Sequence, residues 1–422
     1  MEIGSLLKIF DGNVPPLPLV EAIFDQSNPS YREKKSMIDL SQSNYTINST
    51  EPYLLAESSQ LMTPALLIYP EIVDSNIRAM ISVLGGDTNR WRPHIKTSKL
   101  EFVMRRLVDH GIGNFKCATT LELLTACQAG AKDILIAYPV VGANARRVAE
   151  IIDQHPGIRF SVLVENEAQV ELWKGRSIDL FIDINPGMNR TGIRQENLAG
   201  ITELAQRIKS NGLQLGGLHY YDGHTGGLEL AERDCVAHQG YDQLLAIVAR
   251  LEAVGFQIPE VISAGTPSLP CALSYQGFRN GSFVHRVSPG TIVYSDYTCL
   301  AQLPREYGLR PAALVLSTIV SHPHERIFTC DAGHKAVSAD AGVPTGAVVG
   351  HTDWRPGKPS EEHLPIEIPA GIDLPAIGDL IYILPRHVCP TVNNFNEAVL
   401  VRGGHLSEMA TVTARGREAR TA

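Results

Sequence analysis

The sequence predicts an α/β protein, a closed (β/α)8 barrel followed by a C-terminal antiparallel β domain. Two observations predict the barrel: short apolar runs alternate with amphipathic stretches from about residue 64, and seven or eight such units fit into about 230 residues. A third predicts the β domain, because the helical rhythm stops after about residue 290 and Gly- and Pro-rich turns then separate apolar runs. We therefore divide the 422 residues into an extension at 1–60, a barrel at 61–290 and a β domain at 291–422.

The individual elements follow in order along the chain. Residues 1–60 are polar and irregular, with Pro15, Pro16 and Pro18 breaking any early helix, and we expect them to pack on the body. The barrel is predicted to open with a strand at 65–68 and a helix at 71–84. Continuous apolar runs, which suit parallel strands buried on both faces, predict further strands at 114–118, 133–137, 159–164, 180–184, 215–219 and 260–263, with helices at 121–129 and 143–154. The β domain is predicted to contain strands at 312–320, 326–330, 380–384 and 398–401.

The composition excludes several classes of protein. A hydrophobic content of 44% and a charged content of 19% describe an ordinary soluble globular protein. The net charge of −8 argues against nucleic acid or an anionic membrane as the main partner. Seven scattered cysteines form no disulfide framework and suit a reducing compartment. Since neither a secretory signal nor a run of 18 apolar residues is visible, we expect a cytoplasmic protein.

The densest polar cluster near a predicted strand end is Arg92-Pro93-His94-Ile95-Lys96-Thr97-Ser98-Lys99. Working residues of barrel proteins lie where strands end and loops begin. Neighbouring cations lower the pKa of a lysine, and a lysine of that kind can carry a Schiff base. The alternative is that Lys96 is a solvated surface charge, as most lysines in loops are.

This cluster resembles the Schiff-base signature of the D-threonine aldolase and D-serine dehydratase family, whose pattern is close to R-P-H-x-K-T-H-K. Members are alanine-racemase-like (fold type III) enzymes that use pyridoxal 5′-phosphate (PLP) and combine a (β/α) barrel with a β domain. The resemblance departs at Ser98, where the family usually has His. It runs through most of residues 63–404 in ordered blocks, of which Asp183-Ile184-Asn185-Pro186-Gly187-Met188-Asn189-Arg190-Thr191-Gly192 is the most specific. The resemblance implies that Lys96 joins the cofactor and that His94 lies in its site.

Further cofactor-binding candidates follow from two loops and three side chains. The loop at 263–268 is small and hydroxyl-rich, so its backbone N–H groups can approach a phosphate, and it resembles the Gly-Thr loop of the family at Gly265 and Thr266. An ordinary turn is the alternative. A second phosphate-side turn is implied at Gly290 and Thr291. The resemblance also places Arg190 and Tyr221 at the cofactor, and Tyr138, which follows the predicted strand at 133–137, is expected to reach the same site. For both tyrosines, simple packing at the barrel mouth is the alternative.

The second motif is His387-Val388-Cys389. In an extended segment residues i and i+2 project to the same face, so His387 and Cys389 can coordinate one ion. Imidazole and thiolate together favour zinc over magnesium or calcium. A chance pair is the alternative, but the motif resembles the metal pair of the family, which is His-x-Asp in D-threonine aldolases and His-x-Cys in D-serine dehydratases. We therefore expect a divalent metal, Zn²⁺ before Mn²⁺ or Mg²⁺.

The resemblance implies a PLP-dependent, metal-assisted lyase that acts on a β-hydroxy D-amino acid. Cys389 favours loss of water to give a 2-oxo acid and ammonia, and retro-aldol cleavage to glycine and an aldehyde is the alternative. An amino-acid racemase, which needs no metal, and a non-catalytic PLP-binding protein, which lacks a second domain, are more distant alternatives. Because the two motifs fall in different predicted domains, we also expect a homodimer in which Lys96 and His387 of one site come from different chains.

Overall fold

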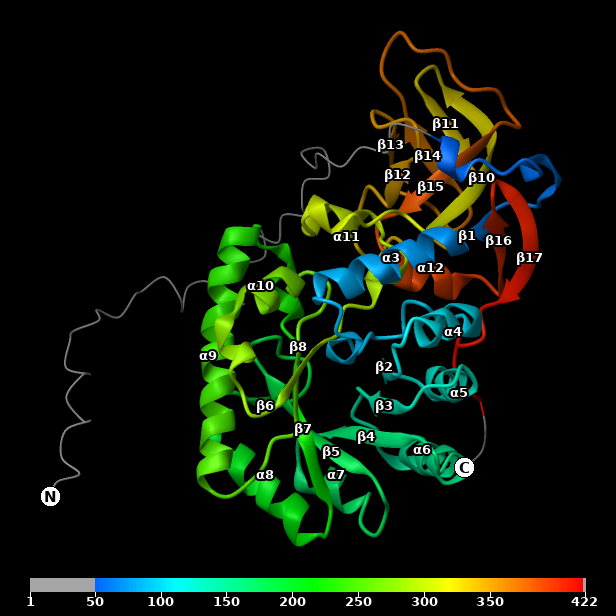
Figure 1. The fold of residues 1–422 in the computed structure, drawn as a ribbon. Helices are drawn as coiled ribbons and strands as arrows, with labels where there is room; N and C mark the ends of the chain where they lie inside the picture. The colour runs from blue at the N-terminus through cyan, green and yellow to red at the C-terminus, as the bar shows by residue number, and fades with distance from the viewer. Residues whose placement is uncertain (1–49, 420–422) are drawn as a thin grey trace, which may run out of the picture. The chain divides into compact units, whose positions relative to one another are not determined.

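The computed structural model describes residues 50–419, and two sheets organise this part of the chain (Figure 1). One sheet has eight strands in the order β2-β3-β4-β5-β7-β8-β9, with β6 beside β5. The other has nine strands in the order β13-β14-β11-β10-β1-β16-β17, with β15 and β12 branching from β10. Residues 1–49 of the predicted extension lie outside the described residues. Its remaining part, with short 3₁₀ turns at Glu51–Tyr53 and Ser58–Gln60, contacts the nine-stranded sheet, where Tyr382 Oη accepts a hydrogen bond from Leu55 N at 3.1 Å.

The first sheet is a parallel barrel. Its strands are β2 (Asn114–Cys117), β3 (Asp133–Ile136), β4 (Arg159–Val164), β5 (Asp179–Asn185), β6 (Ile193–Arg194), β7 (Gln214–Tyr220), β8 (Glu260–Ser263) and β9 (Val284–Val287), all paired in parallel. The extended segment 91–94 lies between the two end strands, since Trp91 bridges Val287 of β9 and His94 bridges Lys116 of β2. This segment occupies the eighth position, so the predicted fold class, a (β/α) barrel with a separate antiparallel sheet, is confirmed.

Helices cover the outside of the barrel (Figure 1). They are α4 (Glu101–Asp109), α5 (Thr120–Gln128), α6 (Gly142–Gln154), α7 (Glu167–Glu171), α8 (Leu198–Ser210), α9 (Leu230–Ala253) and α10 (Leu269–Ser274). Local sequence explains where they begin: Thr119 caps α5 by accepting a hydrogen bond from Glu122 N at 3.1 Å, and Asn166 caps α7 in the same way. Two further helices, α3 (Pro70–Val83) and α11 (Tyr297–Gln302), precede and follow the barrel strands in the chain.

The second sheet is antiparallel except for one strand pair. Its strands are β1 (Ala65–Ile68), β10 (Ala313–His324), β11 (Ile327–Cys330), β12 (Gly346–Val348), β13 (Arg355–Pro356), β14 (Leu364–Glu367), β15 (Leu380–Pro385), β16 (Glu397–Arg402) and β17 (His405–Thr411), and the short helix α12 (Val388–Asn394) joins β15 to β16. Remaining 3₁₀ turns lie at Thr88–Arg90, Gly223–Gly227, Gln276–Arg279, Thr291–Val293 and Arg305–Tyr307.

The strand at 65–68 differs from the prediction, because it is not a barrel strand. It pairs antiparallel with β10 (Leu66 opposite Val315) and parallel with β16 (Leu67 opposite Val399). A four-residue apolar run fits any strand that is buried on both faces, and its pattern carries no information about which sheet receives it. The eighth barrel position is taken instead by residues 91–94, which connect the barrel directly to Lys96.

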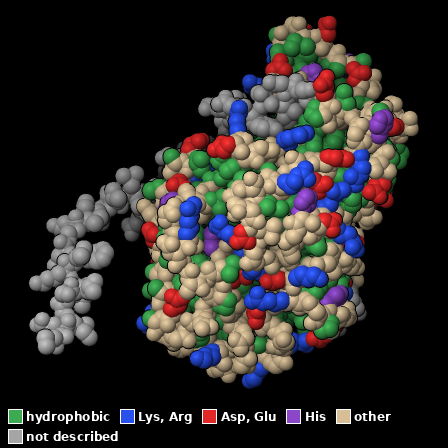
Figure 2. Space-filling view, viewed as in Figure 1, with side chains coloured by type: hydrophobic (Ala, Val, Ile, Leu, Met, Phe, Trp, Pro, Cys, Tyr) green, Lys and Arg blue, Asp and Glu red, His purple; other side chains and the backbone are tan. Residues whose placement is uncertain are grey.

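The surface carries charges of both signs. On the face seen in Figure 2, basic and acidic side chains are interspersed, with no large area of one sign. Within residues 50–419, no helix combines the length and apolarity that a membrane crossing requires.

Candidate active site

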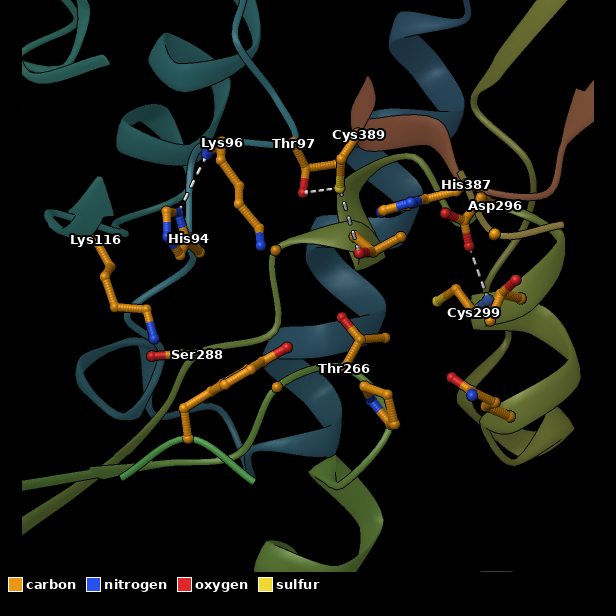
Figure 3. Close-up of a pocket in the computed structure, with 18 residues that line it drawn as sticks. His94, Lys96, Thr97, Lys116, Thr266, Ser288, Asp296, Cys299, His387 and Cys389 are labelled. Carbon is orange, nitrogen blue, oxygen red and sulfur yellow. Dashed lines mark hydrogen bonds between the residues drawn. The ribbon is translucent and has the colours of Figure 1, made fainter. Parts of the chain in front are cut away.

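A pocket of about 240 Å³ lies at the carboxyl ends of the barrel strands, where barrel proteins place their working residues (Figure 3). From the barrel it is lined by His94, Lys96, Thr97, Lys116, Tyr221, Gly265, Thr266, Pro267, Ser288, Gly290 and Thr291. From α11 and the second sheet with its loops it is lined by Asp296, Thr298, Cys299, Gln302, Ala341, His387 and Cys389. The two predicted motifs, at Lys96 and at His387 and Cys389, are far apart in the chain but line one cavity.

Lys96 follows directly on the segment that closes the barrel. Its backbone N–H donates to His94 Nδ1 at 3.3 Å, and its side chain points into the pocket (Figure 3). Within the described part of the chain, Lys96 Nζ makes no hydrogen bond and no ion pair. It is therefore an amine that is available to a ligand.

The cations next to Lys96 in the sequence do not line the pocket, contrary to the prediction that they surround the Lys96 amine. Arg92 is fully buried between Asp133 and Glu260, and Lys99 forms a buried ion pair with Glu122 at 2.9 Å. The cation that lines the pocket with Lys96 is Lys116 on β2. Burial and the charges of Lys96 and Lys116 hold the pKa of His94 well below its ordinary value, so this imidazole is neutral at neutral pH.

Two loops form a cradle suited to an anion, one after β8 with Gly265 and Thr266 and one after β9 with Ser288 and Gly290. Among residues 50–419, the backbone N–H groups of Gly265, Thr266 and Gly290 find no hydrogen-bond acceptor, and the buried Ser288 Oγ also has no partner. Unpaired donors around a concave site are typical of phosphate-binding loops. Glycine is required at 290, because a Cβ there would lie 2.2 Å from the carbonyl oxygen of His94.

The three predicted side chains around the cofactor ring are placed differently from one another. Tyr221 lines the pocket. Arg190 lies outside the pocket lining, with its guanidinium carbon 4.9 Å from the centre of the Tyr221 ring. Tyr138 is 54% exposed and does not line the pocket. Of the predicted site residues, only Arg190 and Tyr138 are therefore not part of the cavity wall.

His387 and Cys389 both face the pocket, although their local conformation differs from the prediction. His387 is extended, but Val388–Asn394 form a helix, so Cys389 lies in a first helical turn rather than in a strand. Cys389 Sγ lies 3.0 Å from Thr97 Oγ1, and His387 Nδ1 lies 2.7 Å from Asp340 Oδ2. Burial opposes charge on either side chain, but the hydrogen bonds that His387 makes with Asp340 and Cys389 raise the pKa of His387, and His387 in turn lowers the pKa of Cys389.

Asp296 holds this pair against the barrel. The carboxylate is buried, with Oδ2 accepting from Val388 N at 2.9 Å and Oδ1 from Cys299 N at 2.8 Å. No group of three or more His, Cys, Asp and Glu side chains in the described part of the chain is placed to hold a metal. A metal bound here would therefore have two protein ligands and open positions.

One chain supplies both Lys96 and His387 to this pocket. The expectation that these two residues of a site come from different chains is therefore wrong. It rested on the two motifs lying in different predicted domains, but β1 and the β15–α12 connection bring the second sheet onto the barrel of the same chain. The homodimer itself stays a prediction.

Sequence reasoning passed over three polar side chains that lie at or behind the pocket wall, Lys116, Asp183 and His219. Each is buried in a barrel strand that is otherwise largely apolar. Ionisable residues are rarely buried without a specific partner or role, so their presence inside apolar strands was the signal available.

The comparisons with known proteins agree with this fold. The family described as "Alanine racemase, N-terminal domain" matches residues 68–298, and a serine dehydratase domain family matches residues 312–401. A D-threonine aldolase of Arthrobacter sp. is 25% identical over 364 residues, which cover 84% of this chain and 93% of that protein. A 3-hydroxy-D-aspartate aldolase of Paracoccus denitrificans is 25% identical over 380 residues, covering 86% and 94%.

Solved structures give the same result for the fold. The crystal structure of D-threonine aldolase from Filomicrobium marinum has a TM-score of 0.76 and 26% identity, and covers 85% of this chain and 96% of that one. D-threo-3-hydroxyaspartate dehydratase from Delftia sp. has a TM-score of 0.74 at 21% identity, covering 86% and 99%. Because the first family match spans more than half of the chain, and both domains and these relatives agree with it, the chain belongs to the alanine-racemase-like family of D-threonine aldolases and D-serine dehydratases.

Proposed function

We propose that this protein is a PLP-dependent lyase that removes water from a β-hydroxy D-amino acid and releases a 2-oxo acid and ammonia. The observation that carries the proposal is the free amine of Lys96 in the same pocket as the unpartnered donors of the anion cradle. The names of the relatives support the substrate class, since D-threonine and 3-hydroxy-D-aspartate are both D-amino acids with a hydroxyl on Cβ.

The residues present fit PLP. The cofactor is an aldehyde with a phosphate, and the pocket offers an amine for the first and a cradle of N–H groups with the Ser288 hydroxyl for the second. Glycine at 290 lets this loop of the cradle lie against the backbone of His94, because a Cβ there would collide with the His94 carbonyl oxygen. When bound, PLP supplies an electron sink that stabilises negative charge at Cα of the substrate.

The protein's own groups would then move protons and orient the substrate. Lys96 Nζ, which lines the pocket, would act as the base that accepts the Cα proton of the substrate. The elimination removes this proton and the β-hydroxyl together as water, and the enamine that is left hydrolyses to the 2-oxo acid and ammonia. The cavity of about 240 Å³ would have to hold PLP as well as the substrate, so the proposed substrate is a small amino acid.

The residues present also fit a divalent metal, which we propose to be Zn²⁺ on His387 and Cys389. A metal-ligating histidine commonly donates its other ring N–H to a carboxylate, and Asp340 Oδ2 lies 2.7 Å from His387 Nδ1. The metal would supply Lewis acidity to the leaving hydroxyl. This pair separates the proposal from a racemase, which has no leaving group to assist.

Retro-aldol cleavage to glycine and an aldehyde is the second candidate, and the aldolase names of two relatives favour it. The two outcomes differ in which proton a base removes, that of Cα or that of the hydroxyl. Cys389 favours dehydration through the resemblance of His387 and Cys389 to the dehydratase pair. Product analysis decides between them.

The experiment loads purified protein with PLP and Zn²⁺ and supplies D-serine, D-threonine or D-threo-3-hydroxyaspartate. We expect a 2-oxo acid and ammonia in equal amounts, and glycine with an aldehyde would favour the second candidate. Formation of the L-isomer alone would support a racemase. Borohydride reduction before digestion should fix the cofactor on Lys96, and an adduct on Lys99 or Lys116 would contradict the assignment.

Metal removal tests the second half of the proposal. Chelation should abolish most turnover without releasing PLP, and Zn²⁺ should restore it. The matched control is His387→Ala, which should retain PLP, have little activity and no longer respond to the chelator. Full wild-type activity after exhaustive chelation would refute the metal site.

A further inference from the structure

A buried chain of three polar side chains lies behind the pocket. Lys116 Nζ is 3.2 Å from His219 Nε2, and His219 Nδ1 is 2.7 Å from Asp183 Oδ1. Asp183 Oδ2 also accepts a hydrogen bond from Thr191 Oγ1 at 2.7 Å. Lys116, His219 and Asp183 are 3%, 4% and 4% exposed, and they come from the barrel strands β2, β7 and β5. The chain thus leads from the barrel interior to an amine on the pocket wall.

The hydrogen-bond pattern fixes where the protons lie. Burial alone would raise the pKa of Asp183, but hydrogen bonds from His219 and Thr191 lower it, so Asp183 is a carboxylate. Burial and the charge of Lys116 lower the pKa of His219, so this imidazole is neutral and its Nδ1–H donates to Asp183. His219 Nε2 then carries a lone pair, which can accept a hydrogen from Lys116 whether Lys116 is an amine or an ammonium.

Backbone hydrogen bonds hold Lys116 beside the segment that leads to Lys96. The Lys116 backbone N–H donates to Pro93 O at 3.0 Å, and its carbonyl accepts from Ile95 N at 2.8 Å. Both amines line the same pocket, and they enter it from the barrel side (Figure 3). In this view His387 and Cys389 lie across the cavity from Lys116, so Lys116 is remote from the hydroxyl that the proposed metal would contact.

A structural role does not account for Lys116. Buried lysines in proteins are normally paired with a carboxylate, but within residues 50–419 Lys116 forms no ion pair with one. Its hydrogen-bond partner is a neutral imidazole, and the Tyr221 ring lies 6.0 Å from Nζ. The pocket therefore contains a positioned nitrogen without a counter-charge, beside a space that receives ligands.

We propose that Lys116 is the anion-pairing residue of this pocket and takes up one proton when an anionic oxygen of the cofactor or of the substrate carboxylate enters. His219 and Asp183 are positioning residues that aim Lys116 Nζ at the ligand. In the balanced step the amine binds one proton from solvent, and the resulting ammonium pairs with the anion. No covalent bond forms or breaks. The inference rests on the proposed function, because that function requires anionic ligands here.

The charges around Lys116 agree with this inference. Burial, followed by the charge of Lys96, lowers the pKa of Lys116 to about 7, so part of the population is amine at neutral pH. Asp183 opposes this decrease, and the other charged or titratable groups that face Lys116 are Arg190, Arg92, His94 and His219. An entering anion shifts the balance to ammonium, so binding should weaken as pH rises above about 7.

The first test counts protons. At pH 8 an amine of pKa about 7 is about nine-tenths deprotonated, so binding of an anion should take up about 0.9 proton. Calorimetry in buffers of different ionisation enthalpy measures this number, first for PLP binding to the apoprotein and then for D-alanine binding to the PLP-loaded protein. Uptake in the first step identifies a cofactor oxygen, and uptake in the second identifies the substrate carboxylate. Lys116→Met should lose it in whichever step the wild type shows it.

Equal proton uptake by wild type and Lys116→Met in both steps would overturn the inference while leaving the proposed function intact, whereas failure of PLP to bind would refute the proposed function.

A second measurement does not depend on PLP. Carbon-13 NMR of the reductively methylated apoprotein should show one lysine titrating near pH 7, absent in Lys116→Met, and shifted lower by Asp183→Asn. Titration of that lysine near its ordinary value of about 10.4 would also overturn the inference.

Discussion

Replacing Arg92 by Leu should destabilise the barrel strongly, because this side chain ties the closing segment 91–94 to the sheet. Its guanidinium donates to Asp133 at 2.9 and 2.7 Å and to Glu260 at 2.8 and 2.9 Å, with the arginine side chain 0% exposed. Removing one partner of a buried ion pair typically costs about 3–5 kcal/mol. Asp133 keeps Arg159 at 3.2 Å and Glu260 keeps Arg286, so we expect about 3 kcal/mol, the lower end of that range.

The pH dependence of this loss has a defined sign. Burial alone would raise the pKa of Asp133, but hydrogen bonds and charge from Arg92 lower it below the ordinary Asp value. A carboxyl whose pKa is lowered by folding stabilises the folded state above its unfolded pKa, and this contribution is lost as pH falls through the folded pKa. The difference between wild type and Arg92→Leu should therefore be full at pH 7 and shrink below about pH 4.

Urea unfolding at pH 7 and pH 3.5 measures the free energy of unfolding for both proteins. Arg92→Lys should give an intermediate loss, since it keeps the charge but not the two-pronged donor geometry. Arg105→Leu is the exposed control: its ion pair with Glu101 is 57% and 29% exposed, and its loss should cost only about 0.5 kcal/mol. A loss below about 1 kcal/mol for Arg92→Leu, well under the range for buried pairs, would refute the reasoning.

Three further predictions concern the site. Gly290→Ala should weaken PLP binding at least about tenfold, or about 1.4 kcal/mol, because its Cβ would lie 2.2 Å from His94 O. Gly227→Ala is the control: a Cβ there has no atom within 4 Å, so the dissociation constant of PLP should not change. Cys389→Asp should have partial activity with Mn²⁺ or Mg²⁺, since oxygen ligands suit those ions, and should shift the product ratio toward glycine. An unchanged product ratio would count against a role of this side chain in product choice. Tyr138→Ala should leave PLP binding unchanged, because the ring is 54% exposed and outside the pocket wall, and a large loss would restore the original assignment.

The fold was predictable to the level of its two sheets, because the repeat of apolar and amphipathic runs is a property of the chain itself. The sheet that receives a strand was not predictable in the same way. Residues 65–68 form a strand where the pattern indicates one, but their partners are β10 and β16, which follow more than 240 residues later in sequence order. Segment 91–94 is the opposite case. It bridges both edge strands of the barrel, but its sequence contains no apolar run that predicts a strand.

In the candidate site, short motifs predicted most of the residues that line the pocket but not their geometry. Lys96 is predicted from its cationic neighbours and from the resemblance of residues 92–99 to a Schiff-base signature, yet Arg92 and Lys99 are neutralised by carboxylates from other strands and helices. Those partners cannot be known before the fold is known. The same holds for Lys116, whose neighbour His219 lies 103 residues away. Only the anomaly of a charged residue in a buried strand was readable from the sequence.

The second sheet has a direct bearing on the chemistry, because it determines what lies opposite the amines. On the proposed function, the barrel supplies Lys96 and the anion cradle, which together bind the cofactor. His387 and Cys389 follow the end of β15. Two contacts hold them at the pocket: Val388 N donates to Asp296 Oδ2 at 2.9 Å, and Cys389 Sγ lies 3.0 Å from Thr97 Oγ1. On the proposed function, the bond that breaks is therefore chosen by residues of the second sheet and its connections. Product specificity should accordingly respond to substitutions at 387–389 that leave PLP affinity unchanged.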